Sequence, residues 1–327
     1  MSNPRNQIAG HEAAAPAGAV ARAAVVALAG ALVLASAAWA TSHSVNISTH
    51  DDQAIASCDQ IVPTFGDHGH PLPMARDQRQ FTLPRSATPV LEMHLSVSGG
   101  MALTGWDGKD YAVTACLAAG GRSDARASEV LHQIDVGFDS GRLSVNGPED
   151  ADWMVYVIVR VPKDAVLDLS SANAPIDLRD ISGRIKARVD NGPIALDRCR
   201  GEIDVEAQNG PVSVHSGGGR QRLEVTNGPL EIELDGGRWD GEGIDAHAEN
   251  GPLSLKIPSG YGSGVSVALS EHSPLECAAG CGGAADVAPD GTRRLHFGPA
   301  HPVIRVSAEN GPVEIDSGAT ARHEASI

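Results

Sequence analysis

Apolar and polar residues alternate in short runs along the chain from residue 91 onward. Leu91, Met93 and Leu95 alternate with polar residues, and a period of two is typical of a β-strand that buries one face. The same alternation returns at 111–117, 134–138 and 143–145, whereas 155–161 is a continuous apolar run that Pro162 ends. Residues 122–132 allow a short helix or a loop, and no long helical period follows residue 40. The pattern predicts an all-β fold.

Asn-Gly-Pro tripeptides divide the second half of the chain at a regular spacing. Four Asn residues lie 18 positions apart, the fifth follows after 23 and the sixth after a further 60. They are Asn173, Asn191, Asn209, Asn227, Asn250 and Asn310, with Ala174 in place of Gly at the first. Apolar residues keep the same places on both sides of each Asn, as Val205, Ala207, Val212 and Val214 do around Asn209. Similarity at a fixed period indicates a repeat architecture.

A single-chain, β-helix-like β-solenoid of ~18-residue coils explains this period. One coil cannot cover its own apolar face, but coils stacked ~4.8 Å apart form a continuous core and pair their backbones. Gly and Pro suit the Asn-Gly-Pro corners, and stacked Asn side chains can bond to one another as a structural corner ladder. The alternative is an antiparallel sandwich with Asn-Gly hairpins, which does not require a strict period.

The N-terminal 40 residues have the order of a secretory signal. An apolar run over 19–40 contains one Arg, Arg22, near its start and ends in Ala38-Trp39-Ala40. An uncleaved signal anchor is the alternative, since the apolar stretch is marginally long enough to cross a bilayer. We therefore predict 1–40 as signal peptide or anchor, 41–84 as a flexible linker, 85–162 as an N-terminal β region (cap and first coils), 163–318 as the repeat, and 319–327 as a polar tail.

Composition and charge exclude some functions. The chain has 25 basic and 41 acidic residues, a formal net charge of −16, which disfavours binding to nucleic acid. Basic residues gather over 179–200 and acidic residues over 202–249. Export would permit disulfides, and of the five cysteines Cys277 and Cys281 form the best local pair. An odd count leaves at least one thiol unpaired within the chain.

Some of these motifs are similar to those of a known family. Gly105-Trp106-Asp107, Val161-Pro162-Lys163 and the successive Asn-Gly corners resemble a bacterial family of putative adhesins, a domain family of unknown function with β-strand repeats. The resemblance covers residues from about 90 to 316. It implies an exported β-solenoid located in the periplasm, on the cell surface or secreted, and it carries over no catalytic residue.

The search for chemistry yields few candidates. The sequence contains no nucleophile elbow, zinc-protease, Walker or dinucleotide motif, so we expect no catalytic residue, cofactor or metal. Asp197, His215 and Glu233 share one outward position on neighbouring coils, and paired carboxylates are what a polysaccharide hydrolase needs. Trp239, in a long corner, is the candidate recognition contact because it is the Trp expected at the surface.

The expected function is therefore a non-enzymatic structural or interaction (adhesin-like) module of the cell envelope. Its partner is an unidentified envelope protein or polysaccharide, and it meets the membrane only through the N-terminal segment if that segment is uncleaved. One alternative is a β-helix protein that binds or cleaves polysaccharide. The other is a membrane-anchored envelope-stress or regulatory sensor.

Overall fold

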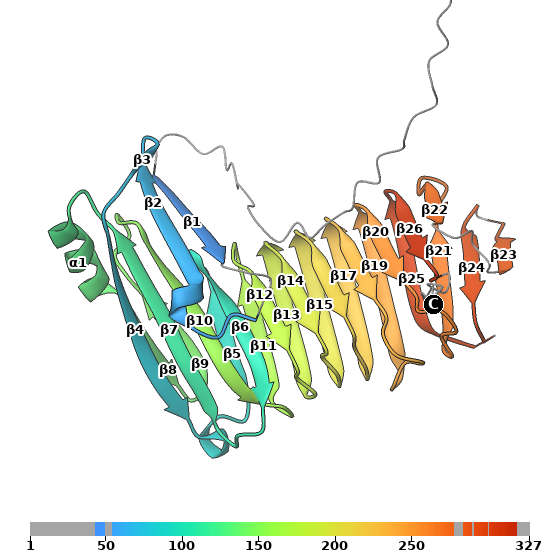
Figure 1. Ribbon diagram of the computed structural model, residues 1–327, viewed down its shortest axis with the longest axis horizontal. Helices are drawn as coiled ribbons and strands as arrows, with labels where there is room; N and C mark the ends of the chain where they lie inside the picture. The colour runs from blue at the N-terminus through green and yellow to red at the C-terminus, as the bar shows by residue number, and fades with distance from the viewer. Residues whose placement is uncertain (1–42, 50–53, 278–283, 290, 300, 319–327) are drawn as a thin grey trace, which may run out of the picture. The chain divides into compact units, whose positions relative to one another are not determined.

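The computed structural model describes residues 43–49, 54–277, 284–289, 291–299 and 301–318 (Figure 1). All described residues belong to one compact unit. The predicted signal segment (1–40) and polar tail (319–327) lie outside the described residues. The described part is all-β, with parallel-rich sheets in a β-helix-like arrangement, as the alternating pattern predicts.

Three sheets account for the described strands. In spatial order, an antiparallel three-stranded sheet contains β1 (His43–Thr49), β2 (Ile61–Asp67) and β3 (His70–Pro71). The eleven-stranded sheet contains β22 (Leu275–Cys277), β26 (Val313–Asp316), β20 (Leu253–Lys256), β18 (Leu230–Glu233), β16 (Val212–His215), β14 (Ile194–Asp197), β12 (Ile176–Arg179), β6 (Gly99–Trp106), β10 (Trp153–Pro162), β7 (Tyr111–Gly120) and β4 (Met74–Leu83). The twelve-stranded sheet contains β23 (Ala284–Val287), β24 (Arg293–Phe297), β21 (Gly264–Leu269), β25 (Pro302–Asn310), β19 (Gly243–Asn250), β17 (Arg220–Asn227), β15 (Glu202–Asn209), β13 (Arg184–Asn191), β11 (Val166–Ser171), β5 (Leu91–Leu95), β9 (Arg142–Asn146) and β8 (Asp135–Asp139).

Between β11 and β20 the chain alternates between the two large sheets and adds one parallel strand to each per coil. The register repeats at the sequence period, so Ile194 pairs with Val212 and Val212 with Leu230. These inward residues are at most 1% exposed. The parallel pairing of this segment differs from the antiparallel sandwich that the sequence left open.

Glycines at the corners allow neighbouring coils to approach each other. At Gly210 the φ angle is +153°, and a Cβ there would lie 2.1 Å from the carbonyl oxygen of Gly192 in the preceding coil. Gly201, at the second corner, has φ +102° and the same 2.1 Å conflict with the carbonyl of Gly183. A side chain at either position would force the backbones of adjacent coils apart.

The segment 41–84, predicted as a flexible linker, instead contains β2, β3 and β4. Its residues 54–67, called the cover below, pack their apolar side chains against β7 and β10. β4 pairs with β7 over ten residues, and Cys58 is joined to Cys116 of β7 by a disulfide. Phe65 is 3% exposed and packs over Gly120. The prediction failed because the strands of this segment pair with partners far along the chain, which no local period reveals.

The continuous apolar run of β10 reflects burial on both faces. Val155, Val157 and Val159 face the main core between the large sheets. Met154, Tyr156 and Ile158 face a second core, which the cover segment closes with Ile61 and Phe65 among others. A strand with cores on both sides reads as an unbroken apolar run.

One α-helix, α1 (Asp124–Gln133), is present among the described residues. The Ser123 hydroxyl accepts a hydrogen bond from the Arg126 amide and caps its start. Ala127, Val130 and Leu131 are its buried residues. Within the described segments, no helix has the length and apolar character needed to cross a membrane.

The order of the strands changes at the C-terminal end of the stack. β25 and β26 lie between the coil of β19 and β20 and the coil of β21 and β22, although they follow both in sequence (Figure 1). The chain therefore leaves one position open, forms the next coil and the β23–β24 hairpin, and returns to fill the open position. This explains why Asn310 follows Asn250 only after 60 residues.

Candidate functional site

The Asn residues of the repeat lie in register along one edge of the stack. Asn191 pairs with Asn209 and Asn209 with Asn227 in the twelve-stranded sheet. Each side chain from Asn191 to Asn310 donates from Nδ2 to Oδ1 of the Asn in the neighbouring coil, at 3.1–3.4 Å. This amide ladder ties coil to coil, and no ligand is needed to account for it.

The outward face of the twelve-stranded sheet carries a column of alternating charge. It runs Lys186, Asp204, Arg222, Asp245 and Arg305 on successive strands. In parallel columns, Arg184 contacts Glu202 at 2.8 Å and Arg188 contacts Glu206 at 2.6 Å. The Arg188 guanidinium lowers the pKa of Glu206. Opposite charges in neighbouring coils meet in these two pairs, and such cross-strand contacts favour the native register.

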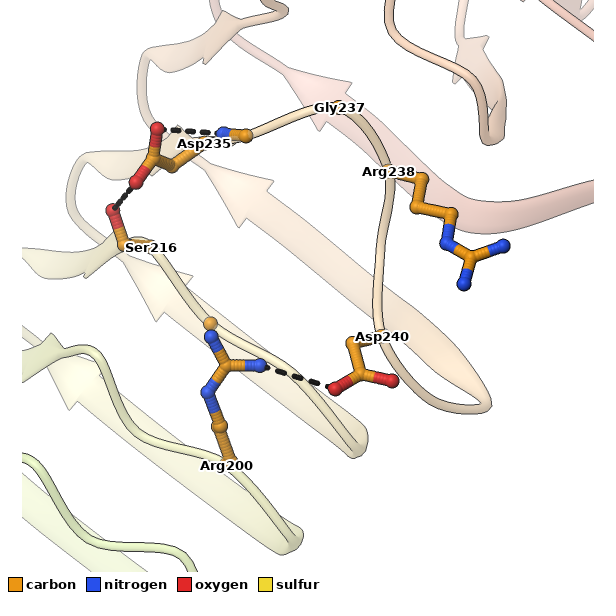
Figure 2. Close-up of a pocket in the computed structure, with 8 residues that line it drawn as sticks. Arg200, Ser216, Asp235, Gly237, Arg238 and Asp240 are labelled. Carbon is orange, nitrogen blue, oxygen red and sulfur yellow. Dashed lines mark hydrogen bonds and ion pairs between the residues drawn. The ribbon is translucent and has the colours of Figure 1, made fainter.

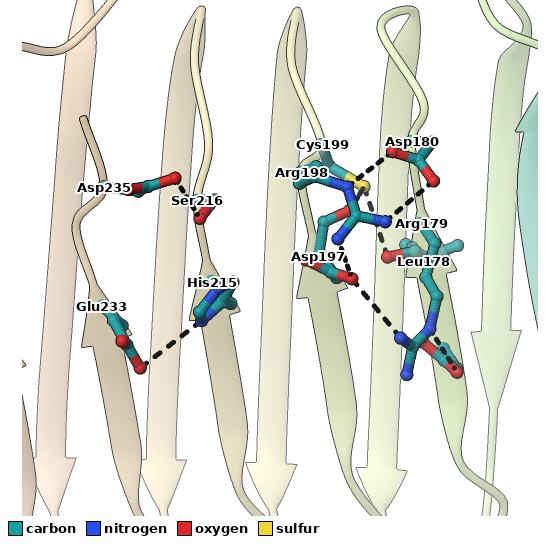
Figure 3. A network of polar contacts seen from close by, with 11 residues as sticks. Leu178, Arg179, Asp180, Asp197, Arg198, Cys199, His215, Ser216, Glu233 and Asp235 are labelled. Carbon is teal, nitrogen blue, oxygen red and sulfur yellow. Dashed lines mark hydrogen bonds and ion pairs between the residues drawn. The ribbon is translucent and has the colours of Figure 1, made fainter. Parts of the chain in front are cut away.

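The eleven-stranded sheet carries a second outward column, which contains the three residues of the hydrolase alternative (Figure 3). Its members on successive strands are Arg179, Asp197, His215, Glu233, Lys256 and Asp316. His215 separates Asp197 from Glu233 by one strand. Asp197 contacts Arg179 at 3.3 Å and Arg198 at 2.7 Å, whereas Glu233 contacts His215 and Lys256 at 3.4 Å each. Both carboxylates therefore form ion pairs with neighbouring side chains, although Oδ1 of Asp197 is buried without a hydrogen-bond partner among the described residues.

Two carboxyls beside this column have opposite pKa shifts. Arg198 donates two hydrogen bonds, of 2.8 and 2.9 Å, to Asp180, and these bonds lower the pKa of Asp180. Burial raises the pKa of Asp177, although Arg179 donates to both of its oxygens at 3.2 Å. The network stabilises one carboxylate and leaves the other partly desolvated.

A polar pocket of about 410 Å³ lies where three successive corners meet (Figure 2). Arg200, Ser216, Asp235, Arg238 and Asp240 line it together with three glycines. The connection that provides most of the lining runs over 234–242, while the equivalent connection one coil earlier runs only over 216–219. This insertion is the first departure from the 18-residue period, and the pocket results from it.

Most polar groups of the pocket are engaged. Arg200 reaches Asp240 at 3.5 Å, and Asp235 accepts hydrogen bonds from the Gly236 amide and the Ser216 hydroxyl, which lower its pKa. The exposed guanidinium of Arg238 makes no hydrogen bond or ion pair with the described residues.

Trp239 is not at the surface, contrary to the expectation that made it the recognition contact. Its side chain is 6% exposed, and its Nε1 donates to the carbonyl of Gly219 at 2.9 Å. The ring packs over Gly217, where an added Cβ would come within 2.9 Å of it. The glycines of the preceding coil make room for the indole, so Trp239 anchors the long connection and leaves Arg238 exposed beside it.

Four of the five cysteines lie among the described residues. The disulfide between Cys58 and Cys116 was not predicted, since its two ends are 58 residues apart. Cys277 is disulfide-bonded, and Cys281, its predicted partner, lies outside the described residues. Cys199 is a buried free thiol whose pKa burial raises to about 12. Among the described residues, no group of three or more His, Cys, Asp or Glu side chains could hold a metal.

No protein-family model and no curated protein matches the chain. Similar solved structures include a putative cell adhesion protein from Clostridium sporogenes, with 8% identity over 74% of this chain and 99% of that one, and a TM-score of 0.28. A putative adhesin from Parabacteroides distasonis has 11% identity, coverage of 73% and 97%, and a TM-score of 0.29. A putative adhesin from Bacteroides fragilis has 11% identity over 74% of this chain and 96% of that one, and a TM-score of 0.25.

These structural neighbours are putative adhesins. The likeness is low both in sequence identity and in TM-score. At these TM-scores it carries no argument about which residues act, and the site is therefore argued from the geometry of this chain alone.

Proposed function

We propose that the chain is an exported, non-enzymatic module of the cell envelope whose β-solenoid, with Asn-Gly-Pro corners, serves a structural or adhesin-like role. The observation that carries this proposal is the arrangement of the outward-facing charged side chains. On both large sheets they line up in columns from coil to coil, and several neighbours in a column form ion pairs. Long polar faces of this kind suit contact with another macromolecule, whereas an enzyme needs reactive groups gathered in a cavity.

The chemistry of the candidate residues supports a non-enzymatic role. A general acid of a glycosidase needs a carboxyl that stays protonated near neutral pH and faces the substrate. Asp197 is instead held in ion pairs with Arg179 and Arg198. Glu233 is held between His215 and Lys256. Neither carboxylate faces the pocket, which is lined by other residues.

Disulfide use supports export. A disulfide at Cys58 and a further disulfide-bonded cysteine at Cys277 suit an oxidising compartment such as the periplasm or the cell exterior. The apolar segment at 19–40 provides the corresponding signal in the sequence.

A second candidate function, polysaccharide binding, is favoured by the pocket. Arg238 is exposed there without a partner among the described residues, and Ser216 and Asp240 also line the pocket. A guanidinium with neighbouring hydrogen-bonding groups suits hydroxyl-rich ligands that carry a carboxylate. The formal charge of −16 disfavours a strongly anionic polymer, so the expected ligand is sparsely charged.

One experiment tests both. The fragment 41–327 is immobilised and used to capture solubilised envelope material, and the captured material is analysed for protein and for sugar. The adhesin-like proposal expects specific retention of at least one of them, and retention of neither contradicts it. Release of new reducing ends from retained polysaccharide, abolished in Asp197→Asn, would contradict the non-enzymatic assignment.

A matched pair of variants locates the contact. Arg238→Ala removes the free guanidinium of the pocket, and Arg76→Ala removes an exposed arginine of β4 that has no hydrogen bond or ion pair with the described residues. Both change the net charge equally. Loss of sugar retention in Arg238→Ala alone would support the pocket, and equal retention in the two variants would assign binding to another surface.

A further inference from the structure

The coil formed by β25 and β26 is enclosed by strands that precede it in sequence. β25 pairs in parallel with β19 on one side and with β21 on the other. β26 pairs in the same way with β20 and β22. Without this coil, β19 would face β21 and β20 would face β22 across the width of one strand, with their edges unpaired. The space between them is called the gap below, and the register of these strands fixes which residues can fill it.

The contacts of this coil are specific to its sequence. Ile304, Val306 and Ala308 are at most 3% exposed, and Val313 and Ile315 are 1% exposed. They extend the apolar columns of Ile244, Ala246, Ala248, Leu253 and Leu255. Asn310 also donates to Asn250 at 3.2 Å and extends the amide ladder. A segment that fills the gap must therefore match the inward residues and the corner Asn together.

The path into the gap crosses a neighbouring strand. β24 lies antiparallel on one side of β21, and β25 lies parallel on its other side. β24 ends at Phe297 and β25 begins at Pro302, so the connection between them is short. Short connections that join elements across a structure favour exchange of the element between copies.

We propose that the coil 302–316 is exchangeable, and that the same segment of a second copy of this chain fills the gap to form an interlocked assembly. A second copy carries every residue that the gap selects, so the exchanged state keeps all strand pairs and the Asn310–Asn250 bond. Only the connection between β24 and β25 changes. Exchange of an identical element is a route to assembly that needs no new interface.

Cysteine pairs placed across neighbouring strands test the exchange. Ser254 and Glu314 are paired outward residues on β20 and β26. Ser213 and Glu231 are the matched pair on β16 and β18, which the exchange leaves within one copy. Adjacent residues of parallel strands are close enough for a disulfide. Each pair introduced into one chain should close within that chain, which verifies the geometry.

The decisive samples are mixtures of single variants with different tags, refolded together at high concentration and then oxidised. The proposal expects a mixed disulfide between Ser254→Cys and Glu314→Cys copies at several times the yield from Ser213→Cys and Glu231→Cys copies. Equal yields in the two mixtures would overturn it, since the control pair reports random collision.

Native mass spectrometry of the unsubstituted chain provides a second measurement that does not depend on the variants. A dimer fraction that grows with the concentration during refolding, and then persists after dilution, supports exchange. A monomer at every refolding concentration overturns it.

Discussion

The N-terminal region over 54–162 and the repeat over 163–256 contain similar strands but are held together differently. In the repeat, each position contacts its equivalents in the coils before and after, through apolar columns, the amide ladder and alternating charges. The N-terminal region has antiparallel partners, a disulfide and a second apolar core. A repeat gains stability from each added coil, whereas the N-terminal region depends on a few contacts between distant segments.

The largest expected effect separates the two regions directly. Phe65→Ala removes a buried ring from the second core and should lower the free energy of unfolding by about 3–5 kcal/mol. Hydrogen exchange followed by mass spectrometry should quicken in 54–67 and β7 and remain slow in β15–β17. The matched variant Leu223→Ala should cost about 2–5 kcal/mol and quicken exchange only in the coils around β17. Uniform acceleration in both variants would show that the regions unfold as one.

The disulfide is the next test. Replacing both Cys58 and Cys116 by Ser frees the cover from β7 and should cost about 2–4 kcal/mol, measured by urea denaturation. Cys199→Ser is the control, because this thiol is buried but crosslinks nothing. Limited proteolysis should then cut the double variant between residues 54 and 72 before it cuts the repeat. Unchanged proteolysis would mean that packing alone holds the cover.

The same contrast explains what the sequence could predict. The strict spacing of Asn191, Asn209 and Asn227 reveals which residues share a column, because equivalent positions in a repeat must align. The cover over 54–67 carries no period, and its partners Cys116 and Tyr156 lie far along the chain. The unbroken apolar run of β10 was the available signal, since a strand that is apolar on both faces must be covered on both.

The candidate site also has one part that the repeat period predicts and another part that it does not. Aligning the chain on its 18-residue register places Lys186, Asp204 and Arg222 in one column, so the alternating charges could be found by counting. The pocket comes from an insertion, and insertions have no equivalent position from which to infer contacts. The burial of Trp239 depends on space left by Gly217 in the preceding coil, and a single corner read alone does not show it.

The amide ladder predicts a difference between its middle and its end. Asn209 donates to Asn191 and to the Asp190 carbonyl and accepts from Asn227, whereas Asn310 donates to Asn250. With roughly 1 kcal/mol per hydrogen bond, Asn209→Ala should destabilise the fold by about 1–3 kcal/mol and Asn310→Ala by about 1 kcal/mol. Urea denaturation of both variants measures this. Equal losses would mean that the ladder bonds contribute little.

The smallest expected effect is a pH dependence of opposite sign at two neighbouring carboxyls. Arg198 lowers the pKa of Asp180, so Asp180 stabilises the fold above its unfolded pKa, and this contribution is lost as the pH falls through its folded pKa. Burial raises the pKa of Asp177, so its ionisation destabilises the fold as the pH rises from its unfolded pKa through its folded pKa. Because the ion pair between Asp180 and Arg198 is partly exposed, it contributes under about 1 kcal/mol to the free energy of unfolding. In urea denaturation over a pH series, the deficit of Asp180→Asn should shrink on acidification. Asp177→Asn should instead remove a fall in stability at rising pH, and parallel profiles for both variants would contradict the opposite environments that the repeat gives these two side chains.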